Sequence, residues 1–328
     1  MLRDTHYHFE FLARDAQREF VETSQELGFR TVAQTLTPSG YRDQTADPVP
    51  GVEYALGFHP WFITSRDQAE AELAVFDEVL AAGGTVATGG VRLIGEIGLD
   101  FQERNLERAP EDLQREVFGH ILGAVARAAG IADAAAVPQA AGTAPGAPDA
   151  AEPALATGAP GVEDLPFVLS IHGVRAFTPV LDMLEESGLL TAASGKTSSG
   201  KTSSGRAASG KTSTRTNPQR VVPIIHWFMG TSDELTRLMR GGGCISFNTM
   251  MLKGKKGRAY AKQVPAERIL LETDLPAGRS AHEKTGRDHA ADQQRNLTHV
   301  LDVVSEARGI TREELVEIIR ANEQRLYR

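Results

Sequence analysis

Two histidines lie two residues apart near the start of the chain, at positions His6 and His8. On an extended segment alternate side chains share one face, so both imidazole rings can point at one cation. Taken alone, such a pair is more often a surface or core feature than a metal site. Its interpretation depends on whether further ligand types occur at equivalent places in the chain.

Further candidate ligands do occur, each near the end of a short apolar run. Runs of Val, Ile and Leu bounded by Gly, Pro or polar residues are typical of strands buried on both faces. The residues that could bind a metal or take part in catalysis lie at the carboxyl ends of these predicted strands. The runs and the polar residues that follow them are Val52–Leu56 with His59, Val91–Ile94 with Glu96, Phe167–Ile171 with His172, Val221–Ile225 with His226, and Ile269–Leu271 with Glu272 and Asp274.

Helical patterns alternate with these strands. The segments Ala13–Leu27, Asp67–Ala82 and Glu111–Ala129 each stop at glycine, and Thr231 and Thr311 have capping-box spacing to a later glutamate. The alternation predicts an α/β fold, a (β/α)8 TIM barrel whose active site lies at the carboxyl ends of the strands. We expect eight strands, at Leu2–His6, Arg30–Leu36, Val52–Gly57, Val91–Glu96, Phe167–His172, Val221–His226, Cys244–Phe247 and Ile269–Glu272.

The composition fits a globular protein and excludes several classes. Of the 328 residues, 41% are hydrophobic and 24% charged, which suffices for a substantial core. The net charge of -8 excludes a globally basic nucleic-acid binder, although not a local basic cleft. A single cysteine, Cys244, rules out a disulfide framework within the chain. Without an apolar leader or a run of ~18 apolar residues, we expect a cytoplasmic protein with no membrane partner.

Two low-complexity segments interrupt the pattern, and we expect both to be surface insertions in a single barrel spanning residues 1–328. Residues 131–164 are rich in Ala, Pro and Gly and acidic, whereas residues 194–216 repeat Ser, Gly, Lys and Thr and are basic. Neither has the periodicity needed to bury a face. Removing them leaves about 270 residues, a normal size for one barrel.

The basic segment contains two sequences that match a phosphate-binding loop, Gly195–Thr202 and Gly205–Thr212. A functional loop of this type needs a buried strand before it and a helix after it. Both matches are flanked only by more Ser, Gly and Thr, so we expect no nucleotide cofactor.

Taken in order, several blocks resemble the signatures of the TatD family of metal-dependent hydrolases, and the resemblance covers nearly the whole chain outside the two insertions. The blocks are Asp4-Thr5-His6-Tyr7-His8, Gly57-Phe58-His59-Pro60, Gly95-Glu96-Ile97-Gly98-Leu99-Asp100, Ile171-His172, His226-Trp227-Phe228-Met229-Gly230, Ile245-Ser246-Phe247 and Leu271-Glu272-Thr273-Asp274-Leu275-Pro276.

The resemblance implies an amidohydrolase-type TIM barrel that binds one or two divalent ions such as Zn, Mn or Mg. By position, the family's metal ligands match His6, His8, Glu96, His172, His226 and Asp274. Mixed imidazole and carboxylate ligands suit such ions, and a carboxylate such as Glu96 can bridge two of them. Asp274 is the expected general base, and with Glu96 it forms the expected catalytic pair. The implied activity is that of a deoxyribonuclease acting on DNA, preferably single-stranded.

Two further residues are candidates for substrate binding. His59 matches a family position near the substrate phosphate, so we interpret it as a substrate contact rather than a metal ligand. After His172 many relatives carry arginine two positions along, where this chain has Val174. Arg175 lies one residue further and is the candidate that replaces the missing phosphate clamp.

Two alternatives remain open at this stage. The same metal centre could hydrolyse a small ester, lactone or amide, as the wider superfamily does. The chain could also be a non-catalytic binding or scaffold protein whose basic repeat recruits a partner. The complete ligand set favours an enzyme, because a degenerate scaffold would be expected to have lost one or more ligands.

Deleting residues 194–216 should leave the rate per metal centre nearly unchanged, because the repeat carries none of the candidate ligands. The measurement is hydrolysis by the deletion variant and the parent at equal metal content. Complete loss of hydrolysis with the fold preserved would show that the repeat itself is required for the function.

Overall fold

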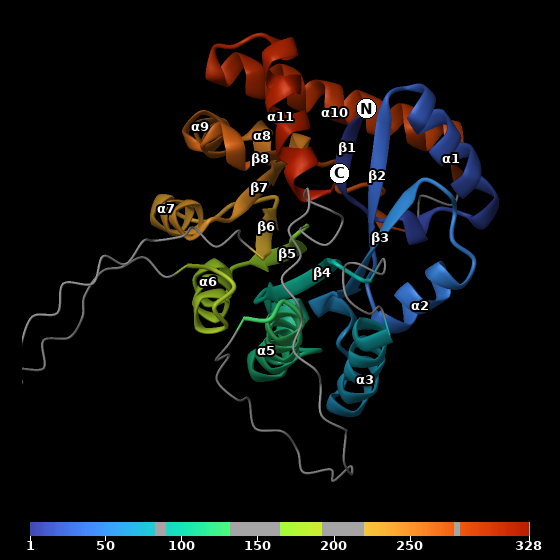
Figure 1. Cartoon of the computed structure of the whole chain (residues 1–328), viewed down its shortest axis with the longest axis vertical. Coiled ribbons are helices and arrows are strands. Elements are labelled where there is room, and N and C mark those ends of the chain that lie inside the picture. The colour runs from blue at the N-terminus through green and yellow to red at the C-terminus, as the bar shows by residue number, and fades with distance from the viewer. Residues whose placement is uncertain (83–89, 132–164, 192–219, 279–282, 328) are drawn as a thin grey trace, which may run out of the picture.

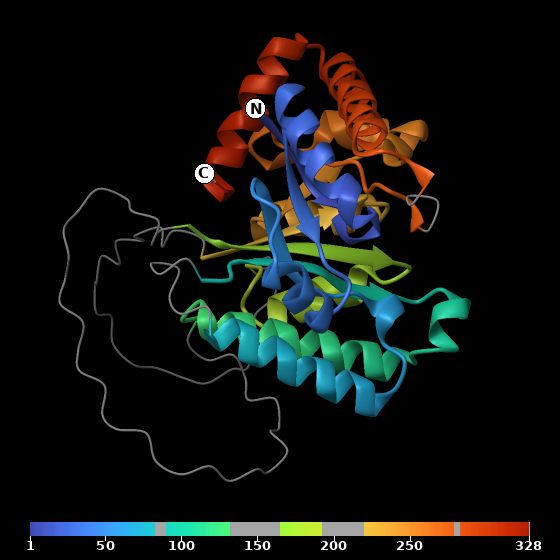
Figure 2. The same cartoon turned by 90° about the vertical axis from the view of Figure 1, so that its right-hand side faces the viewer.

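Eight parallel strands form a barrel, as the alternating pattern predicted. The computed structural model describes residues 1–82, 90–131, 165–191, 220–278 and 283–327. Each strand pairs with the next in the order β1 to β8, and Figures 1 and 2 show the helices around the outside. The strands are β1 (Leu2–Tyr7), β2 (Phe29–Gln34), β3 (Val52–Phe58), β4 (Leu93–Asp100), β5 (Phe167–Val174), β6 (Val221–His226), β7 (Cys244–Phe247) and β8 (Ile269–Leu271).

The predicted helices are also present, and α1 lies beside α10 so that the outer layer closes near the ends of the chain. The capping boxes at Thr231 and Thr311 are confirmed, and a third one at Thr285 begins α10. The helices are α1 (Arg14–Glu26), α2 (Pro38–Ala46), α3 (Arg66–Ala82), α4 (Glu103–Leu106), α5 (Glu111–Ala128), α6 (Phe177–Glu186), α7 (Ser232–Gly241), α8 (Thr249–Lys253), α9 (Lys255–Gln263), α10 (Gly286–Arg308) and α11 (Arg312–Leu326).

Both expected insertions lie almost wholly outside the described residues, and so do the two sequences that match a phosphate-binding loop. Their assignment as insertions in one barrel domain stays a prediction. No described helix combines the length and the apolar character that crossing a membrane requires.

The barrel closes where β1 meets the segment after β8. Tyr7 forms a parallel bridge with Leu275. The amide of Asp274 donates to the carbonyl of His6 at 3.0 Å, and the amide of His8 donates to the carbonyl of Leu275 at 2.7 Å. This closure brings residues from the two ends of the sequence to the same edge of the barrel.

Inward-facing side chains change in character along a strand. In β5, Val168, Ser170 and His172 share one face, while Leu169 and Ile171 point outward into the core beneath the helices. Val168 belongs to the apolar layer at the base of the barrel, and His172 lies at the carboxyl end. The alternation of a strand thus places apolar packing at one end and a polar site at the other.

The end of α11 seals the base of the barrel. Asn322 donates to the carbonyl of Ile269 at 2.9 Å, and the Arg92 guanidinium donates to the carbonyls of Leu326 and Tyr327 at 2.7 and 2.9 Å. The apolar layer at the base therefore combines strand residues with this helix: Val32, Ala55, Leu93, Val168, Val222, Ile224, Cys244, Leu270, Leu326 and Tyr327.

Replacing Leu326 with alanine should lower the free energy of unfolding by about 2–5 kcal/mol, because the side chain is fully buried and leaves a cavity in the basal layer. Urea titration followed by circular dichroism measures the change. Gln324→Ala, two residues earlier on the exposed side of α11, is the control and should change stability by less than about 0.5 kcal/mol. Equal stability of the two variants would show that α11 does not seal the base.

Candidate metal centre

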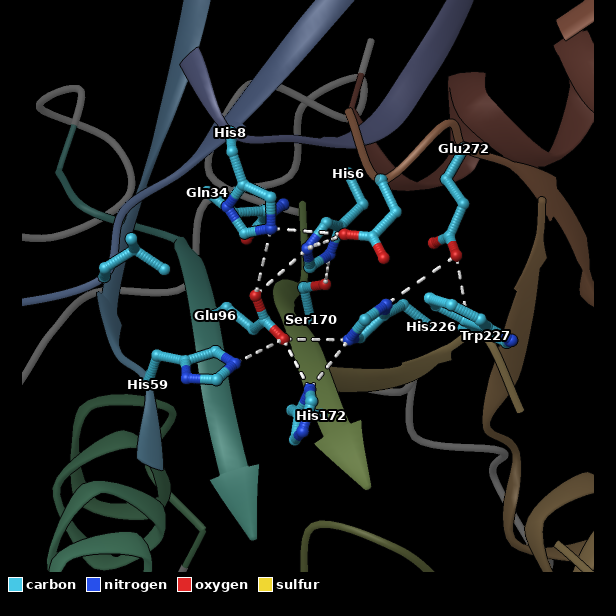
Figure 3. Close-up of polar contacts among 12 residues, drawn as sticks. His6, His8, Gln34, His59, Glu96, Ser170, His172, His226, Trp227 and Glu272 are labelled. Atoms are coloured by element: carbon cyan, nitrogen blue, oxygen red, sulfur yellow. Dashed lines mark hydrogen bonds and ion pairs between the residues drawn. The ribbon is translucent and has the colours of Figure 1, made fainter. Parts of the chain in front are cut away.

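The six ligands expected from the sequence meet at the carboxyl ends of the strands. His6 and His8 come from β1 and the residue that follows it, and Glu96 comes from β4. His172 comes from β5, His226 ends β6, and Asp274 lies in the segment after β8. Figure 3 shows the imidazole rings of His6, His8, His172 and His226 pointing toward Glu96.

Glu96 is the centre of the cluster, with 1% of the residue exposed. Its Oε2 lies 3.1 Å from Nε2 of His6 and 3.6 Å from Nε2 of His8. Its Oε1 lies 2.8 Å from Nδ1 of His172 and 2.8 Å from Nε2 of His226. The two oxygens of one carboxylate therefore face two different pairs of imidazole nitrogens.

Asp274 adds a second carboxylate beside the pair formed by His6 and His8. Its Oδ1 lies 3.1 Å from Nε2 of His8 and 3.7 Å from Nε2 of His6. Four donors around a tetrahedral zinc ion with bonds of 2.0–2.2 Å lie about 3.3–3.6 Å apart. The four separations between an imidazole nitrogen of His6 or His8 and a carboxylate oxygen of Glu96 or Asp274 run from 3.1 to 3.7 Å, so these donors suit a divalent cation.

A second group of donors lies on the other side of Glu96. Nδ1 of His172 and Nε2 of His226 are 3.4 Å apart, and each lies 2.8 Å from Oε1 of Glu96. These three donors are of the types that bind a divalent cation, although the two separations of 2.8 Å are shorter than those around a tetrahedral ion. The arrangement could thus hold one or two ions, with Glu96 shared between them.

The surroundings keep both carboxylates ionised. Burial raises the pKa of Glu96, but His59, His226 and His6 lower it more strongly, and it lies well below its usual range. Burial also raises the pKa of Asp274, yet the hydrogen bond from His8 and the nearby histidines leave it lowered. Ionised carboxylates are the form that binds cations.

His59 reaches the same carboxylate but differs from the other rings. Its Nδ1 accepts a hydrogen bond from the amide of Trp61 at 3.0 Å, and its Nε2 lies 3.1 Å from Oε1 of Glu96. Burial lowers the pKa of His59 to about 4, so the ring is neutral near pH 7. Because Nδ1 is already an acceptor, the proton of the neutral ring lies on Nε2 and this nitrogen has no lone pair for a metal.

Arg175 lies at the mouth of the site rather than in the cluster. It is exposed, lines the cavity above the metal centre and has a positive φ of 55°. Trp227 and Asp274 also have positive φ values, of 43° and 58°. The non-glycine residues with this unfavourable backbone conformation, within the described part of the chain, all follow strands at this end of the barrel.

Close backbone packing fixes the position of Glu96. Its amide donates to the carbonyl of Thr35 at 3.1 Å, and the amide of Thr35 donates to the carbonyl of Gly95 at 3.2 Å. Gly57 lies between these two segments, and a Cβ there would collide with the carbonyl oxygen of Thr35. The lack of a side chain at Gly57 thus allows β2 to hold β4 in place.

The sequence interpretation missed Asp100, which is fully buried at the end of β4. Its Oδ2 lies 3.1 Å from Nε2 of His172 and accepts a hydrogen bond from the indole of Trp61 at 2.6 Å. The bond to His172 leaves Nδ1 of that ring free to face Glu96. The available signal was the spacing from Glu96, because residues four apart on a strand share a face.

Glu272, two residues before Asp274, is also fully buried and takes part in the site. Its Oε1 accepts from the amide of Trp227 at 3.0 Å and from the Asn248 side chain at 2.8 Å. The same oxygen lies 3.7 Å from Nδ1 of His226 (Figure 3). Glu272 therefore holds the segment that presents His226.

A cavity of about 1090 Å³ opens above the cluster. Glu96, Asp274, His59 and His172 lie among the residues that line it. Its lining also includes the partly exposed aromatic rings of Trp61 and Phe62, together with two methionines and three basic residues. The metal centre is therefore accessible to a substrate much larger than water.

Comparison with known proteins identifies the family of this chain. A model of the family described as TatD related DNase matches residues 3–130 and 163–328. The chain is 24% identical to the "uncharacterized metal-dependent hydrolase YabD" of Bacillus subtilis, an alignment that covers 100% of this chain and 99% of that protein. It is 29% identical to the "3'-5' ssDNA/RNA exonuclease TatD" of Pantoea vagans, over 34% of this chain and 44% of that protein.

Solved structures show the same fold. The TatD homologue YJJV of Escherichia coli K12 superposes with a TM-score of 0.63 at 17% identity, covering 99% of this chain and 97% of that one. An uncharacterised amidohydrolase of Saccharomyces cerevisiae superposes with a TM-score of 0.62 at 14% identity, over 99% of both chains. The resemblance expected from the ordered motifs is confirmed, and the chain belongs to the TatD related DNase family of metal-dependent hydrolases.

Proposed function

We propose that this metal-dependent hydrolase is a deoxyribonuclease that cleaves the phosphodiester bonds of single-stranded DNA. The observation that carries the proposal is the pair of donor groups sharing Glu96 beneath a cavity of about 1090 Å³. The curated name of the Pantoea relative, a single-stranded DNA and RNA exonuclease, supports the choice of substrate.

The proposed ligands divide into the two groups described above. His6, His8, Asp274 and Glu96 would hold one divalent ion, and His172, His226 and Glu96 would hold a second. Bound ions of this kind polarise a phosphoryl oxygen and lower the pKa of a bound water molecule to about 7. The donor types do not select among Zn, Mn and Mg.

Asp274 is the proposed general base. Its side chain is 17% exposed, against 1% for Glu96, and it lines the cavity where water and substrate meet. Its carboxylate is ionised and can take a proton from the attacking water. Glu96 lies below and is surrounded by histidines, which suits a shared ligand better than a proton acceptor.

His59 and Arg175 are the proposed substrate contacts. The Nε2 proton of neutral His59 faces Oε1 of Glu96 at 3.1 Å in this structure, and it would donate to a phosphate oxygen instead once Glu96 binds metal. Arg175 can reach a phosphate from the cavity mouth with a permanent positive charge. Arg175 thus replaces, from a different angle, the arginine that the family pattern places at Val174.

Replacing Asp274 with asparagine should reduce the rate on single-stranded DNA by at least ~100-fold, the effect expected from losing a general base. The fold should persist, as measured by circular dichroism, and metal content should be measured for both proteins. Asp43→Asn, on the exposed side of α2, is the matched control and should keep the parent's rate.

Two results would count against this assignment. If the Asp274→Asn variant retains more than a tenth of the parent's rate, Asp274 is not the general base. A parent protein that hydrolyses a small carboxylic ester but leaves single-stranded DNA intact would favour the ester, lactone or amide hydrolase instead.

Replacing Asp100 with asparagine should weaken metal binding by about 10–100-fold, because the carboxylate fixes the tautomer of His172. Isothermal titration with Zn²⁺ or Mn²⁺ measures the affinity. Trp61→Phe removes the indole donor but keeps the contact between Asp100 and His172, so its metal affinity should stay within about 3-fold of the parent. Parent-like affinity in Asp100→Asn would show that Asp100 only supports the loop that follows β4.

A further inference from the structure

The connection from β7 to β8 concentrates positive charge. Helices α8 and α9, residues 249–263, carry basic residues and no acidic residue, although the whole chain has a net charge of -8. All of these basic residues are exposed. They are Lys253, Lys255, Lys256, Arg258 and Lys262.

The charges of this segment are not taken up by close ion pairs, although Lys256 is near enough to Glu234 to lower the pKa of that carboxyl. Within the described part of the chain, none of the five forms an ion pair within 4.0 Å, whereas many surface arginines elsewhere do. The Lys256 ammonium donates to the carbonyl of Met229 at 2.9 Å, and Lys253 contacts the sulfur of Met250 at 3.0 Å. These contacts fix the side chains but leave their charge available to an anionic partner.

The basic end of this connection borders the cavity of the metal centre. Met229, Met250 and Lys256 line the cavity, and the two methionines are 43% and 48% exposed. Outside the metal cluster, the charged residues lining the cavity are Arg104, Arg175, Lys256 and one carboxylate, Glu234. The positive field therefore continues from the α8–α9 connection into the site.

We propose that Met229, Met250, Lys253, Lys255 and Lys256 form a binding surface for the part of a DNA strand that lies beyond the bond being cut. We call these five residues the strand-binding surface. Lysines that follow a phosphate backbone, next to apolar side chains that contact bases, are the combination that binds single-stranded nucleic acid. A small ester would use neither the charge nor the length of this surface.

The inference rests on the proposed deoxyribonuclease function and adds to it, because it makes the substrate a polymer. It also predicts that lysines at the start and at the end of α9 differ in their contribution to DNA binding. Lys255 begins α9 next to Lys256, which lines the cavity, whereas Lys262 lies seven residues later and about 10 Å further along the helix. Lys262 therefore offers a control of the same charge in the same helix.

The test compares two double variants with equal change in charge. Lys253→Gln with Lys255→Gln removes two cations of the strand-binding surface. Arg240→Gln with Lys262→Gln removes two exposed cations from the last turns of α7 and α9. Each is made in the metal-loaded Asp274→Asn protein, and binding of a labelled single-stranded DNA of about 20 nucleotides is measured by fluorescence anisotropy.

We expect the first pair to weaken binding about 10-fold at low salt and to make the slope of log K against log salt concentration shallower by about 1.4. The control pair should change affinity by less than about 2-fold. With Asp274 restored, the ratio of kcat/KM for the long strand to that for a dinucleotide should fall about 10-fold in the first pair.

The outcomes separate the inference from the function on which it rests. If the parent cuts single-stranded DNA and both double variants bind it equally well, the strand-binding surface is wrong and the deoxyribonuclease function stands. If the parent neither binds nor cuts single-stranded DNA in the presence of metal, the proposed function is wrong and the inference is overturned with it.

Discussion

One buried carboxylate organises the whole upper end of this barrel. Glu96 has almost no contact with solvent and lies within 3.6 Å of nitrogens from five histidines. An isolated carboxylate would be very costly to bury, so the histidines are needed for its charge to persist. Shifting any contributing strand by one residue would turn its ligand from the interior to the helices and leave that charge without a partner.

The residues that stabilise the barrel and the residues of the candidate site lie at opposite ends of it. Apolar side chains and the end of α11 fill the base, whereas polar residues and unfavourable backbone conformations gather at the opposite end. The strain at Arg175, Trp227 and Asp274 can persist because the strands below them are fixed by the basal core and by pairing with neighbouring strands. Among the described non-glycine residues, positive φ thus occurs at positions that line the cavity.

Much of the fold could be predicted from the sequence, because each strand is a distinct apolar run and most helices end at glycine. All eight strands occur within a few residues of the expected bounds. The largest difference is β4, expected at Val91–Glu96 and found at Leu93–Asp100, because the polar and glycine residues at its end are buried by partners distant in sequence. The pattern of a single strand does not reveal such partners.

The six candidate ligands were proposed from the ordered family motifs and from their joint placement after predicted strands, and the structure brings all six together. Asp100 was missed, and Glu272 was named without a role, because each acts through another residue, His172 or the segment at His226, and sequence spacing does not reveal a contact between strands. Closure of the barrel between β1 and the segment after β8 also has a temporal consequence. His8 and Asp274 touch although 266 positions separate them, so on a ribosome adding 5–20 residues per second the first histidines wait roughly 15–50 s for their carboxylate. The nascent chain therefore cannot complete its first donor group until its eighth strand has been synthesised.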